Sequence, residues 1–207
     1  MLNLCVFASG SGSNFVELNK FAIKNKTKIF LKLLISNNSN CGAVDYAKKN
    51  QIDYKIIKFS RVVDYSIYVY EMLNCLKKND IHLIALAGYL KKIPIEIIEK
   101  YNRKILNIHP SLLPKFGGKG YYGMNVHKAV IESGLKKTGV TIHFVDKEYD
   151  KGPILYQQEV PVLDEDTEKD LAARVLKVEH KIYKRIIKLL INNRIEWVGD
   201  KPIIKES

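Results

Sequence analysis

The chain has 207 residues and a mass of 23.7 kDa, and its formal net charge at pH 7 is +12. Hydrophobic residues make up 46% of it and charged residues 27%, a balance that excludes disordered and fibrous proteins. Because one domain needs on the order of 150 residues, we expect a single domain over residues 1–207.

The charge and cysteine patterns exclude further classes. Lysines are spread along the chain and do not form a basic stripe interleaved with aromatic residues, so we expect no nucleic-acid partner but an attraction for small anions. Cys5, Cys41 and Cys75 lie far apart, which predicts no disulfide framework, no metal site and a reducing, cytoplasmic location. No secretory pattern and no run of about 18 apolar residues occurs, so we expect no membrane association.

Apolar runs alternate with helical periodicity in the first half of the chain. This alternation is typical of an α/β protein with a Rossmann-like, mostly parallel sheet and helices on both faces. The expected strands cover residues 2–8, 29–36, 53–59 and 81–88, and the expected helices follow at 15–21, 41–50 and 65–78.

The second half departs from this alternation at one long irregular segment, residues 109–123. A connection of this length in a compact domain suggests a functional loop. Around it we expect helices at 94–101, 124–134 and 167–190 and extended segments at 104–108, 140–145 and 154–162. Asp166 and Thr167 offer N-cap oxygens to the last helix.

The segment SGSGSN at 9–14 joins the first expected strand to the first helix. Its glycines let backbone amides converge at a positive helix end, which favours phosphate binding. It is not a Walker A motif, and Phe15 stands where the dinucleotide fingerprint has its third glycine. A purely structural turn therefore remains the alternative.

Asn107 and His109 lie two residues apart at the end of an expected strand, so their side chains point to the same side. Ligands of open α/β sheets bind at such carboxyl ends. Asn can donate to a developing oxyanion, and His can do so or move a proton. A packed polar pair that ends the strand is an equally valid interpretation of the spacing.

The segment LNIHPSLLPKF at 106–116 resembles the signature of the phosphoribosylglycinamide formyltransferases. Four further segments resemble the same family in the same order: SGSGSN, LAGYLKKI at 86–93, GVTIHFVDKEYDKGPIL at 139–155 and RVLKVEHKIY at 174–183. The resemblance implies a formyltransferase fold with an antiparallel strand toward the C-terminal part. It also implies a nucleotide-binding half over about 1–100, a catalytic and folate-binding half over about 101–192 and a short tail over 193–207.

The resemblance implies transfer of the formyl group of 10-formyltetrahydrofolate to the amino group of glycinamide ribonucleotide, in purine synthesis. The catalytic residues would be Asn107, His109 and Asp150, with the carboxylate raising the pKa of His109 and holding the imidazole charged. The folate serves as a cosubstrate, and neither a metal nor a covalent enzyme intermediate is implied.

Binding residues follow from the resemblance position by position. Those for the ribonucleotide are Gly12, Ser13, Asn14, Leu176, Lys177, Val178 and Glu179. Those for the folate are Leu90, Lys91, Lys92, Ile93, Asn107, Asp146, Lys147, Glu148, Tyr149 and Asp150.

The chain departs from the family pattern at two places, the contact to the folate tail and one loop. Tyr65 stands where some members carry an Arg near the folate tail, and Arg61 or a nearby Lys could compensate. The loop at 117–127 is longer than in the shorter members, and we expect it to act as a mobile lid without a catalytic residue.

The alternatives are another formyltransferase-fold enzyme, either a methionyl-tRNA formyltransferase or a formyltetrahydrofolate hydrolase, and a noncatalytic nucleotide-binding module. The module would leave Asn107, His109 and Asp150 without a role. We interpret His143 as a packed or hydrogen-bonded core residue rather than a second acid–base group. Small-molecule substrates are the expected partners, and the chain is expected to be a monomer or a homodimer.

Overall fold

The computed structural model describes residues 1–59 and 64–205. The chain divides into two compact units, Met1–Leu106 and Asn107–Ser207, and each is described separately. That the whole chain forms one domain stays a prediction. In the described ranges, no helix combines the length and the apolar character needed to cross a bilayer.

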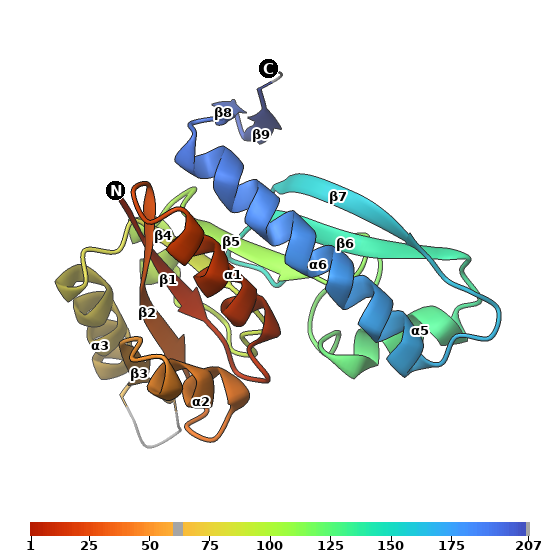
Figure 1. The fold of residues 1–207 in the computed structure, drawn as a ribbon, viewed down its shortest axis with the longest axis horizontal. Coiled ribbons are helices and arrows are strands. Elements are labelled where there is room, and N and C mark those ends of the chain that lie inside the picture. Colours follow the sequence, from red (N-terminus) through yellow and green to blue (C-terminus); the bar gives the residue numbers. More distant parts are fainter. Residues whose placement is uncertain (60–63, 206–207) are drawn as a thin grey trace. The chain divides into compact units, whose positions relative to one another are not determined.

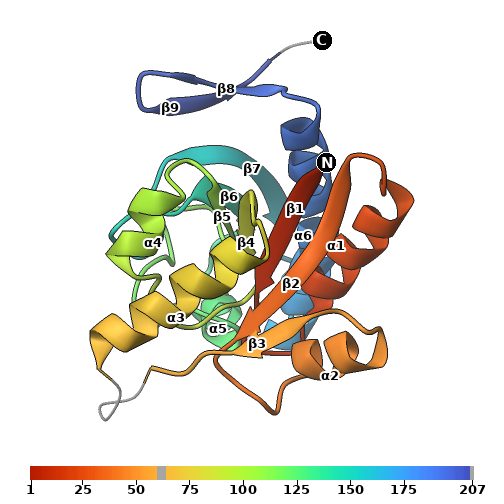
Figure 2. The ribbon, with the colours of Figure 1, turned by 90° about the vertical axis from the view of Figure 1, so that its left-hand side faces the viewer.

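The first unit contains four parallel strands in the order β3-β2-β1-β4. Its strands are β1 (Leu2–Phe7), β2 (Ile29–Ser36), β3 (Tyr54–Ile56) and β4 (Leu83–Leu86). Its helices are α1 (Ser13–Lys24), α2 (Gly42–Lys49), α3 (Tyr65–Lys78) and α4 (Ile95–Lys100). Helices α1 and α2 cover one face of these strands, and α3 and α4 cover the other (Figure 2).

The strand order reverses beside β1, because the chain runs from β1 outward to β3 and then returns to place β4 on the other side of β1. The middle of this sheet is buried on both faces: the side chains of Leu4, Val6 and Ile84 are fully buried. In open α/β sheets, ligands bind outside the carboxyl ends of strands where the order reverses. The glycine loop follows β1 there, and the segment from Gly88 onward follows β4.

The second unit consists of an antiparallel hairpin crossed by a long helix (Figure 1). Its elements are β5 (Ile105–His109), whose last three residues belong to this unit, α5 (Met124–Glu132), β6 (Lys137–Phe144), β7 (Ile154–Pro161), α6 (Glu168–Ile191), β8 (Ile195–Val198) and β9 (Lys201–Ile204). The strand order is β5-β6-β7, and β8 pairs with β9. A capping box between Thr167 and Asp170 starts α6, and side chains such as Leu171 and Val175 are buried along it.

The observed elements differ from the sequence prediction in several places. Strand β4 ends at Leu86, before Gly88 turns with a φ of 72°, and β3 is limited to the three positions at which it pairs with β2. Strand β6 begins at Lys137 rather than at residue 140, because β7 pairs with it from there and provides hydrogen bonds that do not require apolar side chains. The predicted tail at 193–207 contains the β8–β9 hairpin, where Trp197 packs on Phe144 at 4.7 Å between ring centroids.

Candidate active site

The glycine loop of the first unit ends at Gly12, which is the N-cap of α1 and has a φ of 77°. A Cβ at this position would lie 2.7 Å from Ala43 on α2, so both the backbone angle and the space require glycine. Ser13 and Asn14 form the first turn of α1, whose backbone N–H groups have no helical acceptor. The three residues predicted to bind phosphate therefore lie together at a positive helix end.

Ser9 connects this loop to the segment that follows β4. Its Oγ accepts a hydrogen bond from Leu90 N at 2.9 Å, and its backbone N donates to Gly88 O at 3.1 Å. Of the residues predicted to flank the folate, Leu90, Lys91 and Lys92 are exposed, whereas the side chain of Ile93 is buried in the core. The hydroxyl of Tyr65 donates to Glu96, and Arg61 lies outside the described residues.

The second unit brings Asn107, His109 and Asp150 into one cluster. Asp150 Oδ2 lies 3.6 Å from His109 Nδ1, and Asp150 Oδ1 accepts a hydrogen bond from Asn107 Nδ2 at 3.3 Å. The backbone N of Gly118 donates to Asp150 Oδ2 at 2.8 Å. The orientation of the Asn107 amide follows from its neighbour, because an amide oxygen facing the carboxylate would be repelled. The cluster joins β5, the long loop and the β6–β7 turn.

His143 is part of the same cluster. It is buried, as the sequence interpretation expected, and its Nδ1 lies 2.9 Å from Phe144 O, which fixes a proton on Nδ1 because a carbonyl only accepts. Its Nε2 then accepts from Asn107 Nδ2 at 3.0 Å. His143 Nε2 also lies 3.5 Å from Asp150. His143 thus holds the amide of Asn107, and sequence reasoning did not identify this role.

His109 donates its Nε2 proton to Phe116 O at 2.7 Å. Phe116, whose carbonyl accepts this hydrogen bond, and Asp150, whose carboxylate lies 3.6 Å from Nδ1, both adopt positive φ values, 53° and 56°. Such backbone conformations cost roughly 1–2 kcal/mol for a residue with a Cβ and often mark functional sites. Nε2 of His109 is therefore held by the backbone of one residue in a left-handed conformation, and Nδ1 faces the side chain of another.

The electrostatics correct one sequence prediction. Burial lowers the pKa of His109 from its ordinary value of 6.5, and this effect exceeds the opposing attraction of Asp150 and the hydrogen bond to Phe116. The predicted upward shift is therefore wrong for the free chain, in which His109 is neutral at pH 7. Burial alone would raise the pKa of Asp150, but the neighbouring imidazoles of His143 and His109, which become cationic at low pH, and the N–H of Gly118 outweigh burial and lower it below 3.8. Asp150 is thus ionised.

The other predicted residues of the second unit lie on two elements. The segment from Asp146 to Tyr149 forms an exposed turn between β6 and β7, and Gly152 closes it with a backbone so close to Phe144 O that no Cβ would fit. On α6, Lys177 is exposed and Leu176 and Val178 are half-buried. Glu179 is only 8% exposed, which is unusual for a helix carboxylate.

Gly118 and Phe116 are the other contacts that sequence reasoning missed. Both act through backbone atoms, which residue type does not reveal. The signal that existed was indirect: the loop is glycine-rich and directly follows His109. In the described part of the chain, no group of three His, Cys, Asp or Glu side chains could hold a metal ion.

The fold and this cluster define the class of protein. Residues 2–187 match the profile of the family described as formyl transferase, so the chain belongs to the formyl transferase family. Its similarity within that family is to the phosphoribosylglycinamide formyltransferases.

Three relatives carry this assignment. The chain is 46% identical over 203 residues to the chloroplastic phosphoribosylglycinamide formyltransferase of Vigna unguiculata, covering 98% of this chain and 65% of the relative. It is 43% identical to that of Arabidopsis thaliana, covering 99% and 70%. The crystal structure of the phosphoribosylglycinamide formyltransferase of Anaplasma phagocytophilum is 32% identical, with a TM-score of 0.88 over 100% of this chain and 94% of that one. The chain thus spans about two thirds of the length of the plant relatives.

Proposed function

We propose that the chain transfers the formyl group of 10-formyltetrahydrofolate to the amino group of glycinamide ribonucleotide, giving the formylated ribonucleotide and tetrahydrofolate. The observation that carries the proposal is the cluster of His109, Asn107 and ionised Asp150 in a member of the formyl transferase family. The names of the plant and bacterial relatives support the same acceptor.

The Nε2–H group of His109 would donate a hydrogen bond to the formyl oxygen. In the free chain this proton is donated to Phe116 O, so a formyl oxygen in that position would accept the same hydrogen bond. Attack of the amine converts the carbonyl oxygen into an alkoxide, and preorganised donors stabilise the charge that develops there. Asn107 would supply a second donor by exchanging its longer bond, the 3.3 Å bond to Asp150, for the substrate oxygen.

The neutral state of His109 fits this chemistry. Negative charge on the formyl oxygen favours imidazolium, and ionised Asp150 at 3.6 Å supports that form. The charge on His109 would therefore appear as the reaction proceeds, so its stabilisation acts on the transition state more than on the bound substrate. Our proposal replaces the permanently charged imidazole expected from the sequence.

The bonds and protons balance without a metal or a covalent enzyme intermediate. The amine nitrogen forms a bond to the formyl carbon, and the bond from that carbon to the folate nitrogen breaks. The amine loses one proton and the folate nitrogen gains one, carried by water or by the His109–Asp150 pair. Holding both substrates in contact accounts for much of the acceleration that such a reaction requires.

The binding residues are proposed separately for each unit. In the first unit, Gly12, Ser13 and Asn14 would bind the phosphate through backbone N–H groups, and the segment Leu90–Ile93 would flank the pterin. In the second unit, the turn at 146–150 would bind the pterin edge through its backbone, and Glu179 would accept hydrogen bonds from the ribose hydroxyls. The proposed partners are these two small molecules, and the monomeric or dimeric state and the cytoplasmic location stay predictions.

The decisive experiment is an absorbance assay for release of tetrahydrofolate. The purified chain is mixed with 10-formyltetrahydrofolate and one of three additions: glycinamide ribonucleotide, methionyl-tRNA or water alone. We expect turnover only with the ribonucleotide. Turnover with methionyl-tRNA or with water alone would instead favour the tRNA enzyme or the hydrolase. Binding of the ribonucleotide by folded protein without any turnover would favour the noncatalytic module.

A further inference from the structure

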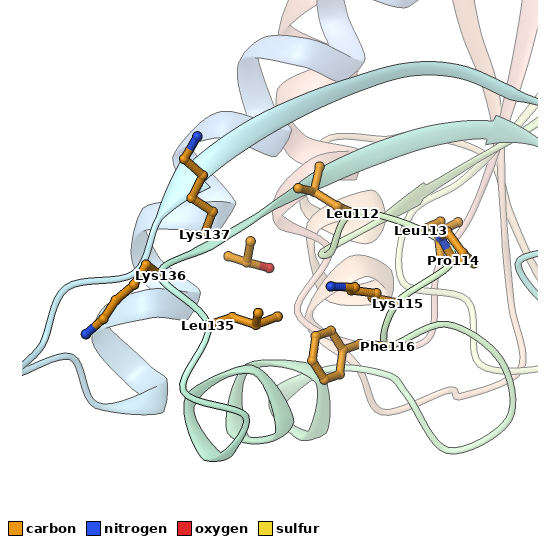
Figure 3. A pocket seen from close by; sticks show the side chains of 9 residues that line it. Leu112, Leu113, Pro114, Lys115, Phe116, Leu135, Lys136 and Lys137 are labelled. Carbon is orange, nitrogen blue, oxygen red and sulfur yellow. The ribbon is translucent and has the colours of Figure 1, made fainter.

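A second recess lies in the same unit as the cluster but has a different lining. It has a volume of 520 Å³ and is formed by residues 112–116 and 135–138. Figure 3 shows Leu112, Phe116 and Leu135 approaching it from different sides, with Lys115 directed across it. Its volume lies within the range of about 300–1,000 Å³ in which small-molecule sites fall. None of its residues is among those proposed to bind the ribonucleotide or the folate.

Two polar side chains of this recess, those of Thr138 and Lys115, have no polar partner among the described residues. Thr138 is only 3% exposed, and its Oγ1 has no hydrogen-bond partner within residues 1–59 and 64–205. Lys136 and Lys137 pair with Asp164 and Glu159, but the ion pairs of the described chain do not include Lys115. Thr138 thus offers a buried hydroxyl that a polar ligand could satisfy, and Lys115 offers an exposed ammonium that is not engaged in an ion pair.

The lining selects one ligand chemistry. Leucine, proline and phenylalanine side chains form walls for an apolar body, and a single uncommitted ammonium matches a single negative charge. A polyanion or a nucleotide would need more cations than Lys115 alone provides. We propose that this recess, lined by Leu112, Phe116, Leu135, Lys115 and Thr138, binds a small amphipathic monoanion whose occupancy changes turnover at His109.

The coupling to His109 runs through one wall of the recess. Residues 112–116 are held by three hydrogen bonds: Ser111 Oγ to Lys115 O at 2.7 Å, Gln157 Nε2 to Leu113 O at 2.9 Å, and Leu113 N to Thr141 Oγ1 at 3.0 Å. The same wall ends at Phe116, whose side chain lines the recess and whose carbonyl accepts from His109. A ligand that contacts the ring of Phe116 therefore acts on the acceptor that holds His109. Binding in the recess changes turnover to the extent that the ligand binds differently before and after substrate replaces the Phe116 oxygen as the partner of His109.

Binding is tested with octanoate, a monoanion with a flexible apolar chain, by calorimetry on the complete chain without substrates. We expect one site per chain with a dissociation constant on the order of 0.1–1 mM, as is usual for ligands of this size. Octylammonium, which has the same chain and the opposite charge, should not bind, because Lys115 repels it. Absence of a saturable octanoate site, or equal binding of octylammonium, would refute the site.

Variants locate the bound octanoate. Lys115→Gln should weaken octanoate about tenfold, whereas Lys119→Gln, which alters an exposed lysine of the same loop outside the recess, should not. Thr138→Val keeps the shape of the side chain and removes the unpartnered hydroxyl, so affinity should fall severalfold while the melting temperature stays or rises. Leu135→Trp fills the recess and should abolish binding. Unchanged affinity in Lys115→Gln and Leu135→Trp would place octanoate elsewhere and overturn the proposal.

Two further measurements distinguish this recess from a substrate site and from a dimer interface. Saturating glycinamide ribonucleotide or folate should leave octanoate affinity within about threefold of its value in the free chain; mutually exclusive binding would mean that octanoate occupies a substrate site and would overturn the proposal. Sedimentation of the wild type and of Leu135→Trp should give the same oligomeric state. A dimer that forms in the wild type and is lost in Leu135→Trp would mean that a second copy of the chain fills the recess.

The affinity for octanoate is measured without turnover, so the binding site can stand even if the proposed formyl transfer fails. The effect on turnover is expected as a severalfold change in kcat, and an unchanged kcat at saturating octanoate would refute the coupling.

Discussion

The Nε2 atom of His109 lies 2.7 Å from the carbonyl oxygen of Phe116, while its Nδ1 lies 3.6 Å from Asp150. The first distance is a hydrogen bond and the second is too long to be one. His109 is thus held by the backbone of the long loop, and burial, which lowers its pKa, favours the neutral form, while the nearby carboxylate can support a charge. If the formyl oxygen of the substrate takes over the hydrogen bond that Phe116 O now accepts, the position of the loop that carries Phe116 determines whether His109 is available for catalysis.

Replacement of His109 by alanine removes the proposed donor to the formyl oxygen. We expect kcat to fall by about 10³-fold while the affinity for glycinamide ribonucleotide changes less than about threefold. The two quantities are measured by the absorbance assay and by calorimetry. Near-normal turnover in His109→Ala would remove this residue from the mechanism.

Replacement of Asp150 by asparagine removes a negative charge that favours imidazolium. The pKa of His109, already below 6.5 because of burial, should therefore fall further, and kcat should drop by about 10²- to 10³-fold. The pKa is measured from the NMR shifts of the His109 ring in both proteins. A pKa that is unchanged or raised in Asp150→Asn would contradict the proposed electrostatics.

Replacement of His143 by phenylalanine removes the acceptor of the Asn107 amide, which is 3.0 Å away in the structure. We expect kcat to fall by about 10- to 10²-fold with little change in the KM of either substrate, because His143 positions Asn107 and does not touch the substrate. A double-mutant cycle with Asn107→Ala should be strongly non-additive. Additive losses would show that the two residues act independently.

The stability of the chain should depend on His127 at mildly acidic pH. Burial, together with the smaller effect of a charge on His109, lowers the pKa of His127 to about 4. A depressed histidine pKa means that the folded state prefers the neutral form, so this stabilisation is complete above pH 6.5 and is lost as the pH falls toward 4.

This loss is measurable by urea unfolding at pH 8 and pH 5. For a pKa near 4 in the folded state, about 2 kcal/mol of unfolding free energy should be lost over this range through His127 alone. The variant His127→Leu should lose correspondingly less than the wild type, since all other titrating groups are common to both proteins. An equal loss in the two proteins would mean that His127 takes up its proton as readily in the folded state as in the unfolded state.

The glycine loop gives a matched pair of variants. Gly12 has a φ of 77°, and a Cβ added there would lie 2.7 Å from Ala43, whereas a Cβ on Gly10 would meet nothing within 4 Å. Gly12→Ala should destabilise the fold by about 1–3 kcal/mol and raise the KM for the ribonucleotide at least about tenfold, because the amides that would bind phosphate are displaced. Gly10→Ala should leave the unfolding free energy nearly unchanged. Equal effects of both variants on KM would argue against phosphate binding at the end of α1.

Much of the fold was predictable because local patterns determine it. Strand β2 and helix α3 have the predicted limits, since a mostly apolar run and a helical period are visible in the sequence itself. The start of β6 and the β8–β9 hairpin were not predicted, because their strands are held by partner strands rather than by an apolar pattern of their own. The turn at Gly199, with a φ of 60°, was the available signal for the hairpin.

The site was predictable only in part. Period-two spacing paired Asn107 with His109, whereas Asp150 lies 41 positions beyond His109 and was assigned by resemblance alone. His143 was interpreted as a core residue, because its contact with Asn107 depends on how two strands approach each other. The direction of the His109 pKa shift was wrong because it depends on burial, which neighbouring residue types do not reveal.

The hairpin at the end of the chain provides an intrinsic optical probe. Trp197 is the only tryptophan in the sequence, and its ring lies against Phe144, the residue whose carbonyl orients His143. Emission from the unlabelled protein therefore originates beside the strand that carries part of the catalytic cluster. Detachment of the last strands would shift that emission to longer wavelength, so ordinary fluorimetry can follow this region during unfolding without any introduced dye.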